Sequence, residues 1–261
     1  MGEDNRIPVG KDPNAPYHAY GDESALPSLS IYGMALLPAS RVQDAKQILV
    51  EEKRKAGIPA EAPLHCRRLL HAQARKGTPF ESLSDDRARA LTVGVARKAS
   101  EAGCVCRYGV FKKPDQGVLL TDFAGKPLEN KEKNLNAIAF WACVAPDFPK
   151  WSEVQMWVGR DATVVEWFGK RRQAHRGYTC FSDIGAPAGM VFEWLPHIAE
   201  GWNPPLMQLG DLYAYLAGRA EVRRGWGQNS WETRLLNEIR HRRNELPPFD
   251  QSAEWKTAKA P

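Results

Sequence analysis

The chain lacks any apolar run long enough to cross a membrane. Its longest apolar stretches, 31–38 and 137–145, fall well short of the roughly 20 residues that a membrane-spanning helix needs. The N-terminal segment, MGEDNRIPVGKDPNAPYH, has acidic residues and prolines where a secretory signal would have a basic flank and an apolar core. We therefore expect neither a membrane segment nor export.

Cysteine is scarce. Five cysteines in 261 residues are too few, and odd in number, for a secreted disulfide scaffold, so reduced thiols in the cytoplasm are the simpler interpretation. Cys104 and Cys106 form a C-x-C pair on one face of a predicted strand. Without a second pair at zinc spacing, a buried structural role is favoured over a metal site. We interpret Cys66, Cys143 and Cys180 as core or incidental thiols.

Several motifs are missing from the sequence. There is no GxxxxGK[ST] loop, no GxGxxG fingerprint and no GxSxG elbow, which argues against a P-loop nucleotide hydrolase, a dinucleotide-binding dehydrogenase and a serine hydrolase of that type. Internal repeats, a heptad seam and low-complexity tracts are also absent.

The chain does have enough apolar residues for one sizeable core. With 43% hydrophobic and 26% charged residues, we expect one domain with insertions. The 36 Lys and Arg residues exceed the 31 Asp and Glu residues, giving a formal charge of +5, which favours a polyanionic partner such as DNA or RNA without requiring one.

Basic residues occur in short runs, which could follow a phosphate backbone, with Trp226 or Trp231 as a surface for base stacking. Each run can equally be a solvated helix face. The runs are Arg67-Arg68, Lys112-Lys113, 170–172 with His175 and Arg176, and 240–243.

Hydrophobic periodicity predicts an α/β fold. Segments 17–22 and 28–38 form an antiparallel hairpin, so Asp22 would lie where the first strand ends. Helical spacing and capping predict helices over 40–56, with Ser40 as a plausible N-cap, and over 84–102. The further expected elements are strands 103–112, 153–159 and 190–195 and helices 134–145, 163–175 and 205–219.

This order predicts a mixed sheet, an antiparallel hairpin plus parallel strands, with helices on both faces. Residues 1–16 would be a flexible lead-in, and 17–220 the core domain, with a helical insertion near 40–102. Residues 221–261 would be a basic, Trp-containing extension, with an amphipathic helix or two short helices over 221–243 and then a tail.

Three acidic positions could carry chemistry. Asp22 and Glu23 are adjacent, so a strand would direct them to opposite faces, and Asp22 is the stronger candidate for the inward ligand. Asp161 follows a predicted strand, where parallel sheets commonly place ligands. Asp211 lies in an apolar helix and needs a partner, either a metal or an arginine. A solvated turn at 22–23 and a loop or N-cap aspartate at 161 are the alternatives.

Together, Asp22, Asp161 and Asp211 form a plausible oxygen-ligand set for Mg²⁺ or Mn²⁺. Two such ions can activate water and stabilise the leaving oxygen in phosphodiester cleavage.

Three segments resemble the family catalogued as domain of unknown function 3800, whose members look ribonuclease-H-like. They are the DES segment after an aromatic strand, the block PLHCRRLLH, and PPLMQLGDLYAYLAGR. The resemblance spans 17–219, although Gly210 and Ala25 replace the usual Ala and Gly. It implies a ribonuclease-H-like fold, Asp22, Glu23 and Asp211 as acidic site residues, and Asp161 less directly.

The resemblance also places His65 close to the acidic cluster, where it could orient water, protonate the leaving oxygen or bind phosphate; a structural role is the alternative, and His71 is a weaker candidate. We expect a metal-dependent nuclease or phosphodiesterase. The alternative is a non-catalytic nucleic-acid or protein-binding module on the same fold, and a third possibility is another metal-assisted phosphoester hydrolase.

Overall fold

A six-stranded mixed sheet forms the centre of the fold. The computed structural model describes residues 15–112, 132–144, 154–159, 197–225 and 229–245. Within them the strand order is β5-β4-β1-β2-β3-β6. The strands are β1 (Tyr17–Ala25), β2 (Leu29–Pro38), β3 (Val105–Lys112), β4 (Val154–Val158), β5 (His197–Ile198) and β6 (His241–Glu245).

The first two strands form the predicted antiparallel hairpin, which is therefore confirmed. The expectation that Asp22 ends the first strand is wrong, because β1 continues to Ala25, opposite Ser30. Pairing extends this far because the turn is short and closes with a hydrogen bond from the Leu26 amide to the Leu29 carbonyl. Asp22 is thus held within a paired strand, opposite Gly33.

Beyond the hairpin, the sheet has both pairing directions. β2 pairs antiparallel with β3, whereas β1–β4, β4–β5 and β3–β6 are parallel pairs. The predicted mixed α/β sheet is confirmed at this level.

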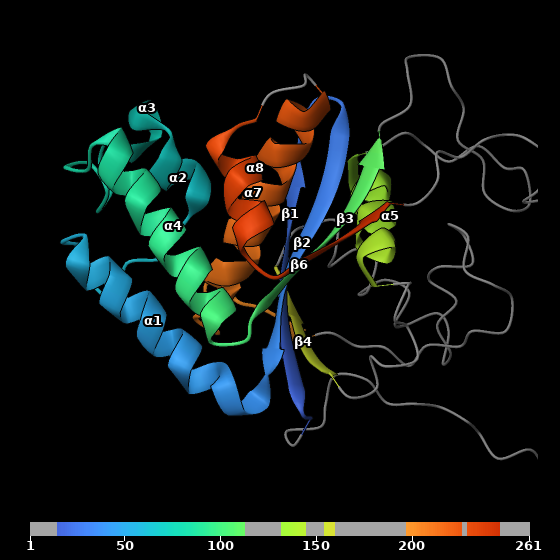
Figure 1. Cartoon of the computed structure of the whole chain (residues 1–261), viewed down its shortest axis with the longest axis horizontal. Coiled ribbons are helices and arrows are strands. Elements are labelled where there is room, and N and C mark those ends of the chain that lie inside the picture. Colours follow the sequence, from blue (N-terminus) through green and yellow to red (C-terminus); the bar gives the residue numbers. More distant parts are fainter. Residues whose placement is uncertain (1–14, 113–131, 145–153, 160–196, 226–228, 246–261) are drawn as a thin grey trace, which may run out of the picture.

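Helices cover both faces of the sheet (Figure 1). α7 (Met207–Gly225) lies across β1 and β2, and α5 (Glu132–Val144) lies on the opposite face, against β2 and β3. Two strand glycines allow this close approach: a Cβ on Gly33 would collide with the α7 backbone at Ala214, and one on Gly109 with the α5 backbone at Ala139.

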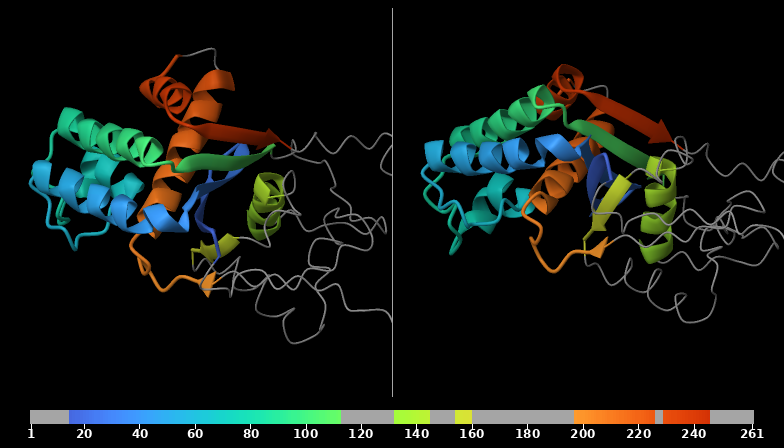
Figure 2. Two further views of the ribbon diagram at one scale, coloured as in Figure 1. Left: turned by 60° about the horizontal axis from the view of Figure 1, so that its bottom comes forward. Right: turned by 90° about the horizontal axis from the view of Figure 1, so that it is seen from below.

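The chain between β2 and β3 forms an outer helical layer (Figure 2). It contains η1 (Ala39–Arg41), α1 (Val42–Lys55), α2 (Cys66–Leu70), α3 (Ala72–Arg75) and α4 (Asp85–Glu101). Figure 2 shows α1 and α4 outside α7. Ser84 caps α4, accepting a bond from the Arg87 amide, but Ser40 lies in η1 and α1 has no side-chain N-cap.

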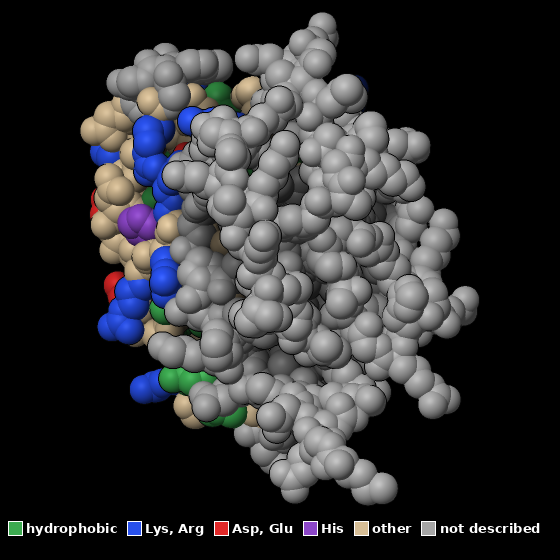
Figure 3. All heavy atoms as spheres, turned by 90° about the vertical axis from the view of Figure 1, so that its right-hand side faces the viewer, with side chains coloured by type: hydrophobic (Ala, Val, Ile, Leu, Met, Phe, Trp, Pro, Cys, Tyr) green, Lys and Arg blue, Asp and Glu red, His purple; other side chains and the backbone are tan. Residues whose placement is uncertain are grey.

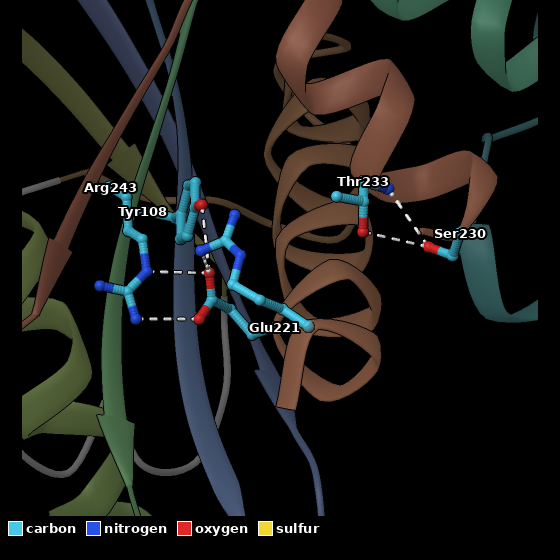
Figure 4. Close-up of polar contacts among 6 residues, drawn as sticks. Tyr108, Glu221, Ser230, Thr233 and Arg243 are labelled. Atoms are coloured by element: carbon cyan, nitrogen blue, oxygen red, sulfur yellow. Dashed lines mark hydrogen bonds and ion pairs between the residues drawn. The ribbon is translucent and has the colours of Figure 1, made fainter. Parts of the chain in front are cut away.

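The segment after residue 220 differs from the expected helical extension. α7 continues to Gly225, α8 (Trp231–Glu238) follows, and β6 then joins the sheet beside β3. Both oxygens of Glu221 on α7 accept bonds of 2.9 Å from the Arg243 guanidinium of β6 (Figure 4). Arg224 and the Tyr108 hydroxyl also donate to Glu221. A buried carboxylate with these donors fixes a basic, polar strand at the sheet edge, which apolar periodicity cannot predict.

Cys66, Cys104, Cys106 and Cys143 are buried free thiols, as expected. In the described chain, no helix is both long and apolar enough to span a bilayer. The predicted helix 163–175, the predicted strand 190–195, the lead-in 1–14, the tail 246–261 and Cys180 lie outside the described residues.

Candidate functional site

Two acidic residues that are far apart in sequence come together where α7 crosses β1. Asp22 lies on the α7 face of β1, because its neighbours on that face, Tyr20 and Ser24, also contact this helix: Tyr20 through its carbonyl at Gly210 and Ser24 through its hydroxyl at Gly218. Asp211 is in the first turns of α7. The end of β4 completes this corner, since Gly159 donates its amide to the Gly21 carbonyl at 3.0 Å.

The Asp211 carboxylate is held by the start of α2. Its Oδ2 accepts a 2.7 Å hydrogen bond from the Cys66 amide, and its Oδ1 lies 3.3 Å from Nδ1 of His65. Its side chain is 12% exposed. The sequence left open whether the partner of Asp211 is a metal or an arginine. Among the described residues, its partners are the Cys66 amide and His65, and no arginine binds it.

The surroundings of the Asp22 carboxyl disfavour its ionised form. Its pKa is raised to about 7, first by burial and then by the negative charge of Asp211. Hydrogen bonds from Glu23 and the charge of His65 oppose this rise without cancelling it. Two carboxylates in one desolvated corner cannot both ionise cheaply, so the site favours either a proton on Asp22 or a cation between the two.

Glu23 occupies a different position from Asp22. It pairs with Tyr32, whereas Asp22 pairs with Gly33, so strand alternation directs the two Cβ atoms to opposite faces. Glu23 still acts on the site, because its amide donates to Oδ1 of Asp22 at 3.1 Å and its side chain also hydrogen-bonds to that carboxyl. It therefore lies beside Asp22 and lowers the pKa of Asp22.

His65 forms the outer wall of the site. It precedes α2 in an extended conformation, its side chain is 33% exposed, and its ring lies 5.5 Å from that of Trp202. Because Nδ1 faces Asp211, Nε2 is the nitrogen that remains for a substrate. The sequence expectation that brought His65 to the acidic cluster agrees with this placement.

Two residues of the late motif support the site, although the sequence did not suggest either of them as a site residue. The Gln208 side chain is buried and accepts a 2.8 Å bond from the Leu64 amide, which fixes the segment leading to His65. Gly210 lets α7 approach β1, because a Cβ there would lie 2.8 Å from the Tyr20 carbonyl oxygen. The sequence signal for Gln208 is its place in the late motif PPLMQLGDLYAYLAGR.

Beside the carboxylates, aromatic rings stand in a row across three strands. The Trp157 ring on β4 stacks on the Tyr20 ring of β1, with 4.9 Å between ring centres, and on the His197 ring of β5, with 5.3 Å between ring centres. The row borders a hollow of about 310 Å³. Its lining consists of Trp157, His197, Ile198, Glu200, Asn203 and Pro204.

The other residues that the sequence suggested lie on several different elements or outside the described residues. Arg67 and Arg68 are exposed on α2 and Lys112 is exposed at the end of β3, whereas the run 240–243 enters β6. The Arg89 guanidinium lies over the Trp231 ring on α8, with its Cζ 5.6 Å from the ring centre. Asp161, Lys113, the run 170–176 and Trp226 lie outside the described residues.

A metal fits the corner in chemical terms. The described residues contain no group of three or more His, Cys, Asp and Glu side chains poised around one point. Mg²⁺, however, is commonly bound through one or two carboxylates, with water and substrate phosphate completing its shell. Asp22 and Asp211 supply that minimum, and a cation there would offset the burial and the repulsion by Asp211 that together raise the pKa of Asp22.

A comparison of the chain with protein-family models, curated proteins and solved structures finds no match.

Proposed function

We propose that the chain is a divalent-metal-dependent nuclease or phosphodiesterase that acts on nucleic acid in the cytoplasm. The proposal includes a ribonuclease-H-like core of the kind that the resemblance to domain of unknown function 3800 implies. The observation that carries it is the pairing of Asp22 and Asp211 in one largely buried corner, where burial and the charge of Asp211 disfavour ionisation of Asp22.

Three features of the fold support this proposal. The hairpin and the parallel strands form the type of mixed sheet that the resemblance implies. The early and late motifs, which are distant in sequence, supply the two interacting carboxylates. Gly159 lies against Asp22, since a Cβ on it would be 2.7 Å from Oδ1, and Asp161 follows only two residues later in the sequence.

In this proposal Asp22 and Asp211 hold Mg²⁺ or Mn²⁺, with Asp161 as a further ligand. The bound metal supplies Lewis acidity toward the phosphoryl oxygens and a more acidic water. The Cys66 amide holds the Asp211 carboxylate in place. Asp211 in turn orients His65, whose Nε2 positions water or protonates the leaving oxygen. Glu23 holds the Asp22 carboxyl through its amide.

A nucleic-acid substrate is supported by charge. The chain carries a net charge of +5, and basic side chains are prominent along the described part of the face in Figure 3. Such a surface raises the local concentration of a polyanion.

The test is cleavage of labelled single-stranded and duplex DNA and RNA with Mn²⁺, Mg²⁺ or EDTA. Wild type is compared with Asp22→Asn and Asp211→Asn, with folding confirmed for each. We expect metal-dependent cutting that both substitutions reduce at least a hundredfold. Binding of nucleic acid without cleavage, unaffected by EDTA, would instead identify the non-catalytic module.

A second readout does not depend on choosing the right substrate. A ligand at a hundred times its Kd stabilises the native state by about 2.7 kcal/mol. Mn²⁺ should therefore raise the thermal midpoint of wild type at pH 8 and have much less effect on Asp22→Asn. Equal shifts in both proteins would remove Asp22 from the metal site.

A further inference from the structure

α7 presents one narrow polar stripe to the surface. From Met207 to Glu221, the only residues of this helix that are not buried are Asp211, Tyr215 and Arg219. They are spaced four residues apart, so they lie in line on one side of the helix. The stripe therefore starts at a carboxylate of the proposed active site and ends at a guanidinium.

Arg219 is partly buried and has no acidic partner among the described residues. Its Cζ lies 5.4 Å from the centre of the Tyr215 ring, and its Nη2 donates to Nε2 of His71 at 3.1 Å. The Tyr215 hydroxyl is also 3.4 Å from that nitrogen. Aromatic and imidazole contacts orient the guanidinium but do not neutralise it.

The carboxylates of α7 nearest to Arg219 are already engaged. Glu221 is bound by Arg243 and Arg224, and Asp211 is bound by the start of α2. Arg67 on α2 adds a second positive charge near His71. The pKa of that ring is lowered first by burial and then by the charges of Arg219 and Arg67. A partly desolvated cationic group without an anion is the arrangement that an anionic ligand would complete.

The geometry points to Arg219, with Arg67 also near His71, as a binding site for a backbone phosphate of the nucleic acid, several nucleotides away from the scissile bond. This inference rests on the proposed function for its ligand class. Eight residues of helix span about 12 Å, and each strand of duplex DNA advances about 3.4 Å per nucleotide. If α7 runs along the duplex axis, the phosphate at Arg219 would thus lie a few nucleotides from the carboxylates.

Planar guanidinium groups bind phosphate in a bidentate manner, which an ammonium group cannot reproduce. His71 contributes by position: its Nε2 accepts from Arg219, so the neutral ring holds the guanidinium without competing for phosphate. The Arg219 guanidinium also lies over the face of the Tyr215 ring, which limits its movement.

The experiment measures binding of a labelled oligonucleotide by fluorescence anisotropy in EDTA, between roughly 50 and 200 mM salt. Arg219→Ala should weaken binding about tenfold, the loss of one charged hydrogen-bonding contact. The slope of log K against log salt should become shallower by about 0.7 for single strands or 0.9 for duplex. Arg219→Lys should retain the slope and lose part of the affinity.

Arg41→Ala is the control, because it removes an exposed guanidinium that pairs only with Asp44, three residues on along the chain. It should change affinity less than twofold. If Arg219 only supports the fold, Arg219→Ala will lower thermal stability while leaving the salt slope at the wild-type value, and that result overturns the inference. An unchanged affinity overturns it as well.

Hydrolysis of a small phosphodiester distinguishes a failure of the phosphate site at Arg219 from a failure of the proposed nuclease. Metal-dependent hydrolysis of a small phosphodiester, bis(p-nitrophenyl) phosphate, that is lost in Asp22→Asn supports the carboxylate chemistry whatever Arg219 does. A wild-type protein that hydrolyses this ester but binds no oligonucleotide overturns the phosphate site alone. Loss of binding in Arg219→Ala without any hydrolysis by wild type upholds the phosphate site and rejects the nuclease.

Discussion

The Asp211 carboxylate on α7 accepts a 2.7 Å hydrogen bond from the backbone amide of Cys66, 145 residues earlier in the chain. This bond fixes the first turn of α2 against α7 and places His65 beside Asp211. One carboxylate thus both anchors a loop and faces a neighbouring acid, Asp22. Its anchoring role alone would explain its presence in an apolar helix, so the experiments below separate anchoring from chemistry.

Gln208→Ala should reduce activity without altering the carboxylates. The substitution leaves the buried Leu64 amide without its acceptor, at a cost of about 1–3 kcal/mol, and releases the segment that carries His65. We expect about a tenfold loss of cleavage rate, measured under saturating Mn²⁺. Gln208→Glu keeps an acceptor oxygen and should retain more activity; equal losses in the two variants would show that the Leu64 bond is not what matters.

Asp22→Asn should stabilise the metal-free protein at high pH. The pKa of Asp22 is raised to about 7 from 3.8, so between these values the native state holds a proton that the unfolded chain has released. The free energy of unfolding of wild type therefore falls as pH rises through this window. At pH 8 the variant should be more stable by a few kcal/mol, roughly 1.4 per pKa unit.

Urea denaturation in EDTA from pH 4 to pH 8 measures this difference. The advantage of Asp22→Asn should shrink steadily as pH falls and be small at pH 4, close to the unfolded-state pKa of 3.8, where the native carboxyl is protonated and the unfolded one partly so. A variant that is no more stable than wild type at pH 8 would mean that Asp22 is not under the electrostatic strain described here.

The sequence could predict the elements whose signals are local. Ser84 and the acidic first turn marked α4, and the aromatic alternation on both sides of a short turn marked the β1–β2 hairpin. It could not place the end of β1 beyond Asp22, because Glu23 and Ser24 resemble a turn until Tyr32 and Ile31 are known to pair with them.

Strand β6 could not be predicted from the sequence, for a related reason. The segment 241–245 is HRRNE, which has no apolar alternation and resembles a solvated helix face. Its position depends on parallel pairing with β3 and on Arg243 meeting Glu221, contacts that no local pattern encodes. Likewise, the sequence suggested Asp22, Asp211 and His65 as site residues, but not that a backbone amide would hold Asp211.

Glu221→Ala should loosen the sheet edge at β6. Glu221 is 6% exposed and bridges Arg243 and Arg224, and removing one partner of a buried ion pair typically costs 3–5 kcal/mol. Because both arginines are partly exposed, we expect about 2 kcal/mol in urea denaturation, with faster amide exchange in β6. Glu238→Ala breaks the exposed pair with Arg97 and should cost less than about 1 kcal/mol; comparable losses would mean that the Glu221 cluster does not hold β6.

Gly159→Ala should displace the Asp22 carboxylate while leaving the fold intact. The added Cβ would lie 2.7 Å from Oδ1 of Asp22, closer than such atoms approach, and the carboxylate is the part that can move. A displacement of about 1 Å can cost a hundredfold in rate, so the cleavage rate per folded molecule should fall by one to two orders of magnitude, with thermal stability changed little. Gly77→Ala makes the same chemical change where nothing lies within 4 Å; it adds backbone strain, since Gly77 has φ of 70°, but should leave the rate unchanged. If Gly159→Ala cleaves as fast as Gly77→Ala, the position of the Asp22 carboxylate does not set the rate, and the metal-centred proposal loses its main geometric support.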